Sequence, residues 1–244
     1  MGERRLLLDA GNTSLKWAVV ENGSWRTSGR SDYAEWTALA AHLKAGTDCF
    51  IASVASAGHE QRIARLLERA GITPTWLAAE PGFGDVKNAY LDPAQLGVDR
   101  WMALIAARKH TREAVLVVSA GTAMTVDALS AAGEFLGGVI VPGVRLMRES
   151  LQAGTARIDG ASGDWQAFPR TTADAVQSGI IAALCGAVEQ QHARLAAREG
   201  TPPRCLVTGG DAQTLLPYLN VTASHVPALV LEGIDCVARG AISR

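Results

Sequence analysis

Residues 6–13 read Leu-Leu-Leu-Asp-Ala-Gly-Asn-Thr, and residues 116–123 read Leu-Val-Val-Ser-Ala-Gly-Thr-Ala. In both stretches an apolar run of strand length ends at an Ala-Gly pair, and the two pairs lie 110 residues apart. A second apolar segment, a glycine turn and an aromatic residue follow each pair in the same register. Each stretch therefore predicts a strand, a tight turn, a second strand, a glycine turn and a third strand.

The repeat indicates a duplicated α/β chain, although two unrelated glycine hairpins could share this spacing by chance. We expect one half at residues 1–112 and the other at 113–244, with a nucleotide cleft between them. Periodicity adds several elements after the two repeated units. The expected helices cover 33–44, 60–70, 96–110 and 173–198, and the further strands cover 49–54, 74–78, 135–141, 205–208 and 226–231.

The composition indicates a folded enzyme or binding protein of ordinary charge. The chain has 244 residues, of which 48% are hydrophobic and 19% charged, and its formal net charge is −1. This balance argues against a nucleic acid or an anionic membrane as the main partner. Neither a secretory signal nor an apolar run of membrane-spanning length is found, and the four cysteines are scattered. We therefore expect a cytoplasmic protein.

The first glycine turn has the residue types that bind phosphate. Gly11 permits a close approach of the backbone, while Asn12, Thr13 and Ser14 add short donors at the end of a strand. Asp9 can hold Mg²⁺ through a water molecule, because Mg²⁺ usually keeps several waters and binds few carboxylates. Lys16 can neutralise a phosphate charge. A plain hairpin with side-chain turn bonds is the alternative interpretation.

Two further glycine turns end predicted strands, at Ala120-Gly121-Thr122-Ala123 and at Gly209-Gly210-Asp211. Thr122 is the polar candidate in the second turn, and the third suits an adenine or a ribose. The sequence has no Gly-x-x-x-x-Gly-Lys-[Ser/Thr], no Gly-x-Gly-x-x-Gly after a strand and no Gly-x-Ser-x-Gly. These absences exclude the usual signatures of P-loop kinases, dinucleotide-binding domains and serine hydrolases.

Leu96-Gly97-Val98-Asp99-Arg100-Trp101 opens a predicted helix. An ionised Asp99 in the first turn can orient a substrate hydroxyl and accept its proton. Arg100 can pair with a substrate carboxylate through its forked guanidinium. The alternative is structural: an acidic residue that stabilises its helix, followed by an arginine on a solvated face.

Taken together, these pieces resemble the type III pantothenate kinases, also called the Bvg accessory factor family, over nearly the whole chain. The resemblance rests on six ordered motifs, DAGNTSLK (9–16), NAYLDPAQLGVDRW (88–101), SAGTAMTVD (119–127), EFLGGVIVPG (134–143), TTADAVQSG (171–179) and TGGDA (208–212). It implies duplicated ribonuclease H-like domains of the acetate/sugar kinase–Hsp70–actin superfamily, an α/β fold. It also implies ATP-dependent phosphorylation of pantothenate to 4'-phosphopantothenate, the first step of coenzyme A biosynthesis.

The resemblance carries site residues onto this chain. It implies that Asp99 is the proton acceptor and that Asp9 also serves the metal. The implied ATP contacts are Asp9, Ala10, Gly11, Asn12, Thr13, Ser14, Leu15, Lys16 and Thr122, and the implied pantothenate contacts are Tyr90, Gly97, Val98, Asp99, Arg100 and Thr172. It further implies Mg²⁺ with ATP, activation by K⁺ or NH₄⁺, and a homodimer whose pantothenate pocket lies near the subunit interface.

One position departs from the family pattern. Many members carry Asp where this chain has Ser119, and that Asp helps to bind the monovalent cation. We therefore expect a weakened dependence on K⁺. Two other functions stay open at this point: a kinase or phosphohydrolase acting on another small substrate, and a regulatory protein that binds nucleotide without catalysis.

Overall fold

A computed structural model describes residues 3–156, 158 and 162–242. The chain forms two compact units, one made of residues 1–109 with 228–244 and the other of residues 110–227. The C-terminal segment thus groups with the first unit, while the division into halves at 112/113 stays a prediction. No helix in the described part of the chain combines the length and apolarity needed to cross a membrane.

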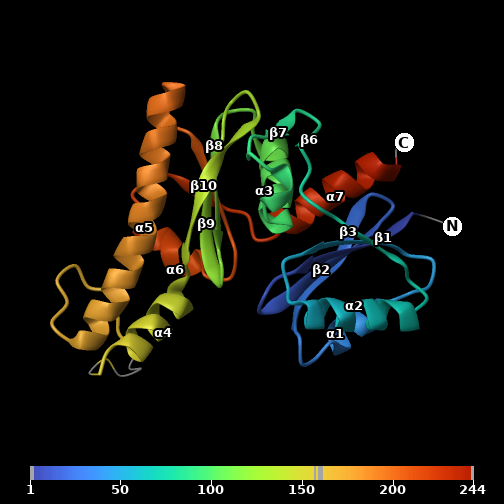
Figure 1. Cartoon of the computed structure of the whole chain (residues 1–244), viewed down its shortest axis with the longest axis horizontal. Coiled ribbons are helices and arrows are strands. Elements are labelled where there is room, and N and C mark those ends of the chain that lie inside the picture. The colour runs from blue at the N-terminus through green and yellow to red at the C-terminus, as the bar shows by residue number, and fades with distance from the viewer. Residues whose placement is uncertain (1–2, 157, 159–161, 243–244) are drawn as a thin grey trace. The chain divides into compact units, whose positions relative to one another are not determined.

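The sheet of the first unit has the strand order β3-β2-β1-β4-β5 (Figure 1). Strands β1, β2 and β3 form an antiparallel meander, and β4 and β5 add parallel strands on the other side of β1. The bounds are β1 Arg4–Ala10, β2 Ser14–Glu21, β3 Ser24–Asp32, β4 Asp48–Ser53 and β5 Pro74–Trp76.

The second unit repeats this topology, with the order β10-β9-β8-β11-β12. Its first three strands are antiparallel, and β11 and β12 again lie parallel beside the first strand. The bounds are β8 Val115–Ala120, β9 Ala123–Leu129, β10 Glu134–Pro142, β11 Arg204–Thr208 and β12 Ala223–His225. The same order and the same directions in both units confirm the duplication that the two Ala-Gly turns predicted.

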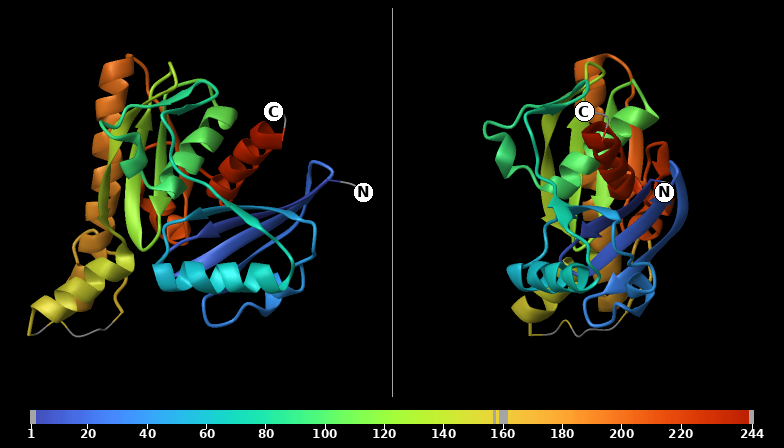
Figure 2. Two further views of the ribbon diagram at one scale, coloured as in Figure 1. Left: turned by 45° about the vertical axis from the view of Figure 1, so that its right-hand side comes forward. Right: turned by 90° about the vertical axis from the view of Figure 1, so that its right-hand side faces the viewer.

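Helices cover both faces of the first sheet (Figures 1 and 2). On one side lie α1 (Thr37–Ala40) and α2 (Ala57–Arg69), where leucine, isoleucine and valine side chains of the strands meet Leu39, Ile63 and Leu67. On the other side α7 (Leu229–Ile242) contacts β1, β2 and β4. The unit also contains the hairpin β6 (Gly82–Phe83) and β7 (Val86–Asn88), the turn η1 (Pro93–Gln95) and α3 (Val98–His110).

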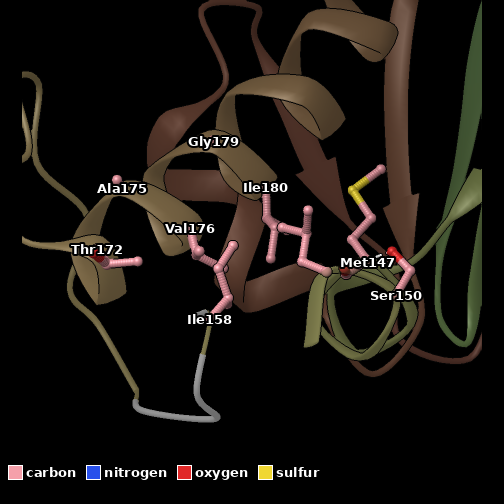
Figure 3. Close-up of a pocket in the computed structure, with 9 residues that line it drawn as sticks. Met147, Ser150, Ile158, Thr172, Ala175, Val176, Gly179 and Ile180 are labelled. Atoms are coloured by element: carbon pink, nitrogen blue, oxygen red, sulfur yellow. Dashed lines mark hydrogen bonds between the residues drawn. The ribbon is translucent and has the colours of Figure 1, made fainter. Parts of the chain in front are cut away.

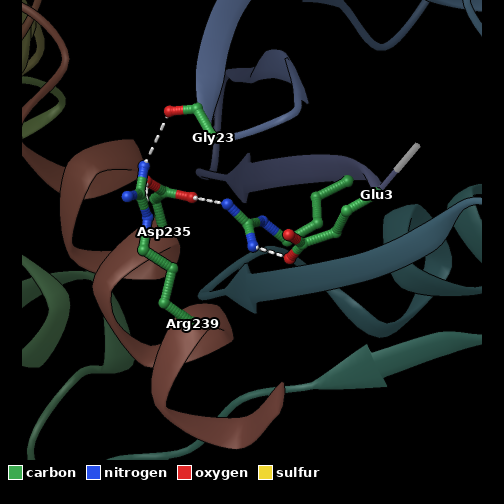
Figure 4. Close-up of polar contacts among 5 residues, drawn as sticks. Glu3, Gly23, Asp235 and Arg239 are labelled. Carbon is green, nitrogen blue, oxygen red and sulfur yellow. Dashed lines mark hydrogen bonds and ion pairs between the residues drawn. The ribbon is translucent and has the colours of Figure 1, made fainter. Parts of the chain in front are cut away.

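A buried ion pair between Arg5 and Asp235 joins β1 to helix α7 (Figure 4). The Arg5 guanidinium donates to Asp235 at 3.0 Å, and the two side chains are only 3% and 4% exposed. Arg5 also pairs with Glu3, while Arg239 donates to Asp235 at 2.8 Å and to the Gly23 carbonyl at 3.1 Å. These contacts join the first strand of the chain to its last helix.

The second unit packs its long helix α5 (Thr172–Glu199) on β8 and β9, beside α4 (Val144–Gly154), α6 (Ala212–Leu215) and η2 (Leu216–Tyr218). The side chain of Thr171 accepts from the Asp174 N–H at 3.1 Å, as expected of a helix cap. Gly200, with φ of 75°, ends the helix in the left-handed conformation. Ile181, Leu184 and Val188 pack in the core of this unit.

Two element predictions were wrong. Only Thr37–Ala40 of the expected helix 33–44 is helical, because Asp32 accepts the Ala34 and Glu35 N–H groups in a turn. Leu39 is the one buried residue of that short helix. The expected strand 226–231 is instead the start of α7, and the edge strand lies earlier, at Ala223–His225. Leu231, Ile234 and Ala238 are buried at helical spacing, a pattern that continues beyond the predicted strand.

Candidate active site

The first glycine turn holds its backbone in a fixed arrangement. The Gly11 N–H donates to the Ser14 carbonyl at 3.1 Å, and the Ala10 carbonyl accepts from the Val54 N–H at 2.9 Å. Asn12 and Thr13, between them, are exposed. The turn therefore presents an exposed backbone segment with short polar side chains, which suits an anionic ligand.

Asp9 and Lys16 lie beside each other at the base of this turn. They are paired residues of β1 and β2, and Lys16 Nζ is 3.7 Å from Asp9 Oδ2. Asp9 is only 7% exposed. Burial raises the pKa of its carboxyl to about 6, Lys16 opposes that rise, and the charge of Asp99 adds to it.

Because the pKa of Asp9 is raised, the ionised form of its carboxyl lowers the stability of the folded protein at neutral pH when no ligand is bound. A carboxyl whose pKa is higher in the folded state stabilises that state fully below the unfolded pKa, here 3.8, and loses this contribution as the pH rises through about 6. We expect Asp9→Asn to be more stable than the parent by about 3 kcal/mol at pH 8, because one pKa unit corresponds to about 1.4 kcal/mol. The gain should vanish near pH 4.

Urea unfolding at pH 4 and pH 8 in EDTA, without nucleotide, measures this difference. Asp48→Asn is the control, because Asp48 is an exposed aspartate in the same unit. Its stability should differ from that of the parent by less than about 0.5 kcal/mol at both pH values. An Asp9→Asn effect of equal size at the two pH values would refute a buried, titrating Asp9.

Asp99 is fixed at the start of α3. Its Oδ1 accepts from the Arg100 N–H at 2.8 Å, and the residue is half-buried. A Cβ on Gly97 would lie 2.7 Å from Asp99 Oδ1, so glycine at 97 leaves room for this carboxylate. Burial raises the pKa of Asp99, against the lowering effects of the Arg100 N–H and the Arg100 charge. The carboxylate is therefore more basic than the ordinary aspartate expected from the sequence.

Arg100, the residue after Asp99, contacts Tyr90. Arg100 Nη1 donates to Tyr90 Oη at 2.9 Å, and the guanidinium carbon lies 5.6 Å from the centre of the Tyr90 ring. Arg100 is 6% exposed, which contradicts the alternative that placed it on a solvated face. Asn88 supports the loop that carries Tyr90, because its Nδ2 donates to the carbonyls of Glu80 and Pro93. A buried guanidinium held by a phenol is suited to bind a carboxylate.

The glycine turns of the second unit meet one another. The Gly143 N–H donates to the Thr122 carbonyl at 2.9 Å, and the Asp211 N–H donates to the Ala120 carbonyl at 3.0 Å. A Cβ on Gly143 or on Gly209 would collide with the backbone of this same turn, so only glycine fits at either position. Thr122 is thus held in a cluster of three close backbone segments.

Thr172 lies apart from that cluster, at the exposed start of α5, where it borders an apolar cavity of about 460 Å³ (Figure 3). Helices α4 and α5 form most of its wall. The lining residues are Met147, Ser150, Leu151, Ile158, Thr172, Ala175, Val176, Gly179 and Ile180. The cavity was not predicted, because it depends on how the consecutive helices α4 and α5 pack together.

A further residue at the first turn was also missed. Tyr33 Oη donates to the Gly11 carbonyl at 2.6 Å, although Tyr33 carries no motif of its own. Its sequence position, one residue beyond the third strand of the predicted meander, is the one signal that places it near the turn.

The residues of the first unit fit Mg²⁺ bound together with a nucleotide. Mg²⁺ is usually held by one or two carboxylates, water and substrate phosphates, and does not need a cage of protein ligands. Asp9 supplies one such carboxylate at the base of the first glycine turn. Among the described residues no group of three or more His, Cys, Asp or Glu side chains could hold a metal by itself.

Comparison with known proteins identifies the family. The family model "Type III pantothenate kinase" matches residues 5–194. The chain belongs to the type III pantothenate kinases, and it is therefore a kinase. A type III pantothenate kinase of Thiobacillus denitrificans is 66% identical over 96% of both chains, and one of Aromatoleum aromaticum is 44% identical over 96% of this chain and 97% of the relative.

Solved structures agree on the fold. A Campylobacter jejuni protein described as a Baf-family transcriptional activator has a TM-score of 0.64 at 22% identity and covers 98% of this chain and 100% of its own. A Sinorhizobium meliloti protein described as a 2-dehydro-3-deoxygalactonokinase has a TM-score of 0.58 at 17% identity over 97% and 99% of the two chains. This type III pantothenate kinase thus shares its duplicated α/β fold with both proteins.

Proposed function

We propose that this kinase transfers the γ-phosphoryl group of ATP to the primary hydroxyl of pantothenate, giving 4'-phosphopantothenate and ADP in the first step of coenzyme A biosynthesis. The observation that carries the proposal for this chain's own residues is the placement of Asp99. Its half-buried carboxylate is held by the Arg100 N–H at 2.8 Å, and its charge raises the pKa of Asp9 at the base of the glycine turn. A basic carboxylate beside a phosphate-binding turn can serve a hydroxyl that attacks phosphorus.

Asp99 acts as the general base. The hydroxyl oxygen of pantothenate bonds to the γ-phosphorus, the bond from phosphorus to the bridging oxygen of ADP breaks, and the hydroxyl proton passes to the Asp99 carboxylate. Burial raises the pKa of this carboxylate, which brings its basicity closer to the operating pH. The backbone hydrogen bond from Arg100 keeps the acceptor oriented.

Residues Asp9–Lys16 bind ATP, and Thr122 contributes a further contact. Asp9 would hold Mg²⁺ through water, and the ion would neutralise charge on the phosphates when it is bound. The exposed N–H groups of the first turn and the Lys16 ammonium stabilise the charge of the transferring group. The ion pair of Lys16 with Asp9 keeps that ammonium at the turn.

Pantothenate is bound by Tyr90, Gly97, Val98, Asp99, Arg100 and Thr172. Arg100 holds the carboxylate, because its guanidinium is buried and already oriented by Tyr90. Gly97 and Val98 provide backbone contacts next to the base, and Thr172 contributes its hydroxyl.

The first experiment is ADP release by purified protein with MgATP and either K⁺ or NH₄⁺, with and without pantothenate. Release that depends on pantothenate supports the assignment. If ADP release does not respond to pantothenate under either cation, the substrate assignment fails. A regulatory protein that binds nucleotide would then describe the chain better.

The kinase also needs a monovalent cation, K⁺ or NH₄⁺, bound more weakly than in relatives that carry Asp at position 119. Ser119 lies opposite Thr125 and Thr208 in the sheet, so this row supplies hydroxyl oxygens without a carboxylate at that position. We expect the activity of the parent to rise only slightly with K⁺ concentration. For Ser119→Asp we expect half-saturation at about tenfold less K⁺, because an added negative charge close to the cation binds it more tightly.

A KCl titration of the ADP assay at constant ionic strength, balanced with an organic cation, measures this dependence. Parent activation by K⁺ as steep as in an Asp-bearing relative would contradict the prediction. An unchanged half-saturation in Ser119→Asp would place the cation elsewhere.

We further propose that the chain acts as a cytoplasmic homodimer. Leu151, which lines the cavity of α4 and α5, and Phe168 are exposed apolar side chains that a partner surface would cover. Sedimentation equilibrium of the purified protein tests the dimer, and a monomer at micromolar concentration would exclude it.

A further inference from the structure

Tyr33 lies outside every motif assigned above, yet the fold brings its hydroxyl to the ATP turn. Strand β3 ends at Asp32, which pairs with Ser14 at the start of β2. The Asp32 carboxylate then accepts the N–H groups of Ala34 and Glu35 and turns the chain. Tyr33, which lies between Asp32 and Ala34, is therefore held beside the loop that precedes Ser14.

The contact is short and buried. Tyr33 Oη donates to the Gly11 carbonyl at 2.6 Å, and the residue is 6% exposed. The His59 ring stacks on the Tyr33 ring at 3.7 Å with an angle of 7° between the planes, and Trp36 meets its edge at 6.2 Å. Burial, with the charges of Asp9 and Glu60, raises the pKa of Tyr33 to about 12. The phenol is thus a donor at all physiological pH values.

This hydrogen bond fixes the direction of a neighbouring donor. A trans peptide is planar, so the carbonyl of Gly11 and the N–H of Asn12 point in opposite directions. When Tyr33 holds the Gly11 carbonyl on its own side, the Asn12 N–H points to the other side of the turn. The preceding peptide is fixed in the same way, because Val54 holds the Ala10 carbonyl and Ser14 accepts the Gly11 N–H. Asn12 is exposed.

We propose that Tyr33 is a positioning residue for nucleotide binding, which holds the Gly11–Asn12 peptide so that the Asn12 N–H faces a phosphate of ATP. It acts through the turn and does not touch the nucleotide. This inference rests on the proposed assignment of residues 9–16 to ATP. His59 supports Tyr33 through its ring, whereas the hydrogen bond to Gly11 is made by the phenol alone.

The test is Tyr33→Phe, which keeps the ring and its stacking and removes only the hydroxyl. We expect the Kd for MgATP, measured by calorimetry on the full chain, to rise about three- to tenfold, the effect of one net hydrogen bond. The Kd for adenosine should stay within about twofold, because adenosine has no phosphate. In the kinetic assay the KM for MgATP should rise while the KM for pantothenate stays constant.

Two further variants separate the hydroxyl from ring packing. His59→Phe keeps a stacked ring and the Tyr33 hydroxyl, and should bind MgATP like the parent. Tyr218→Phe removes a tyrosine hydroxyl in the second unit and should also be unchanged. Thermal melting establishes that each variant is folded at the assay temperature.

The outcomes distinguish the positioning role of Tyr33 from the assignment of residues 9–16 to ATP. If the parent binds MgATP and Tyr33→Phe binds it equally well, the positioning role is wrong while the proposed function stands. Equal losses in Tyr33→Phe and His59→Phe, or equal losses for MgATP and adenosine, would show a packing effect and overturn the inference. If the parent itself does not bind MgATP, both the inference and the ATP assignment fail.

Discussion

Replacement of Asp99 by Asn is expected to lower kcat for pantothenate phosphorylation by about 10²–10⁴-fold, the contribution typical of a general base. The amide has nearly the same shape, but it cannot accept the hydroxyl proton. In the parent, burial raises the pKa of the Asp99 carboxyl and so strengthens it as a base. Steady-state kinetics with saturating MgATP and K⁺ measure the change, and the KM for MgATP should vary by less than about threefold.

Arg100→Met is the contrasting variant, because it removes the proposed carboxylate contact without removing the base. Its main effect should be a pantothenate KM raised by about tenfold to a hundredfold, the loss of a charge-assisted hydrogen bond. An Asp99→Asn enzyme with near-parental kcat would remove the base assignment. If both variants changed kcat alone and left the pantothenate KM unaltered, Arg100 would not hold the substrate carboxylate.

Replacement of Asp235 by Ala is expected to destabilise the protein by about 3–5 kcal/mol, because it leaves the buried Arg5 charge without its main partner. Arg5 and Asp235 are joined at 3.0 Å with side chains 3% and 4% exposed. Glu3, which also pairs with Arg5, is 43% exposed at its side chain and can compensate only in part. Urea unfolding at pH 7 measures the loss.

The matched control is Glu113→Ala, which breaks the Arg204–Glu113 pair. That pair has a similar N–O distance of 2.8 Å, but its side chains are 63% and 67% exposed. Solvent screens such a pair, so the expected change is at most about 1 kcal/mol. The double variant Arg5→Met with Asp235→Leu should recover most of the stability lost in Asp235→Ala. Equal effects of the two single variants would show that burial does not set the strength of the Arg5–Asp235 pair.

Local sequence patterns predicted the secondary structure correctly wherever it depends on neighbouring residues alone. The two Ala-Gly turns and their flanking apolar runs predicted both meanders, because alternation, a tight turn and strand length are properties of neighbouring residues. The starts of α5 at Thr172 and of α3 at Val98 lie within two residues of the predicted starts at 173 and 96. The family motifs also lie on these turns and helix starts.

The errors came where packing overrides local preference. The segment after Pro227 is apolar enough for a strand, but its buried residues recur at helical spacing and it packs on β1 as α7. The segment 33–44 has helix-forming residues, yet Tyr33 contacts the Gly11 turn and leaves only one short helical turn, at Thr37–Ala40.

The sequence by itself determined the duplicated fold, the family and the residues proposed for ATP and pantothenate, because these depend on short ordered motifs and on repeated turns. Only the tertiary structure decided the environment of those residues: the burial that raises the pKa of Asp9 and Asp99, and the phenol of Tyr33 on the Gly11 carbonyl. The same holds for the ion pair between Arg5 and Asp235, whose partners are 230 residues apart. Burial and contacts between distant residues arise from how elements pack, and no local pattern in the chain encodes them.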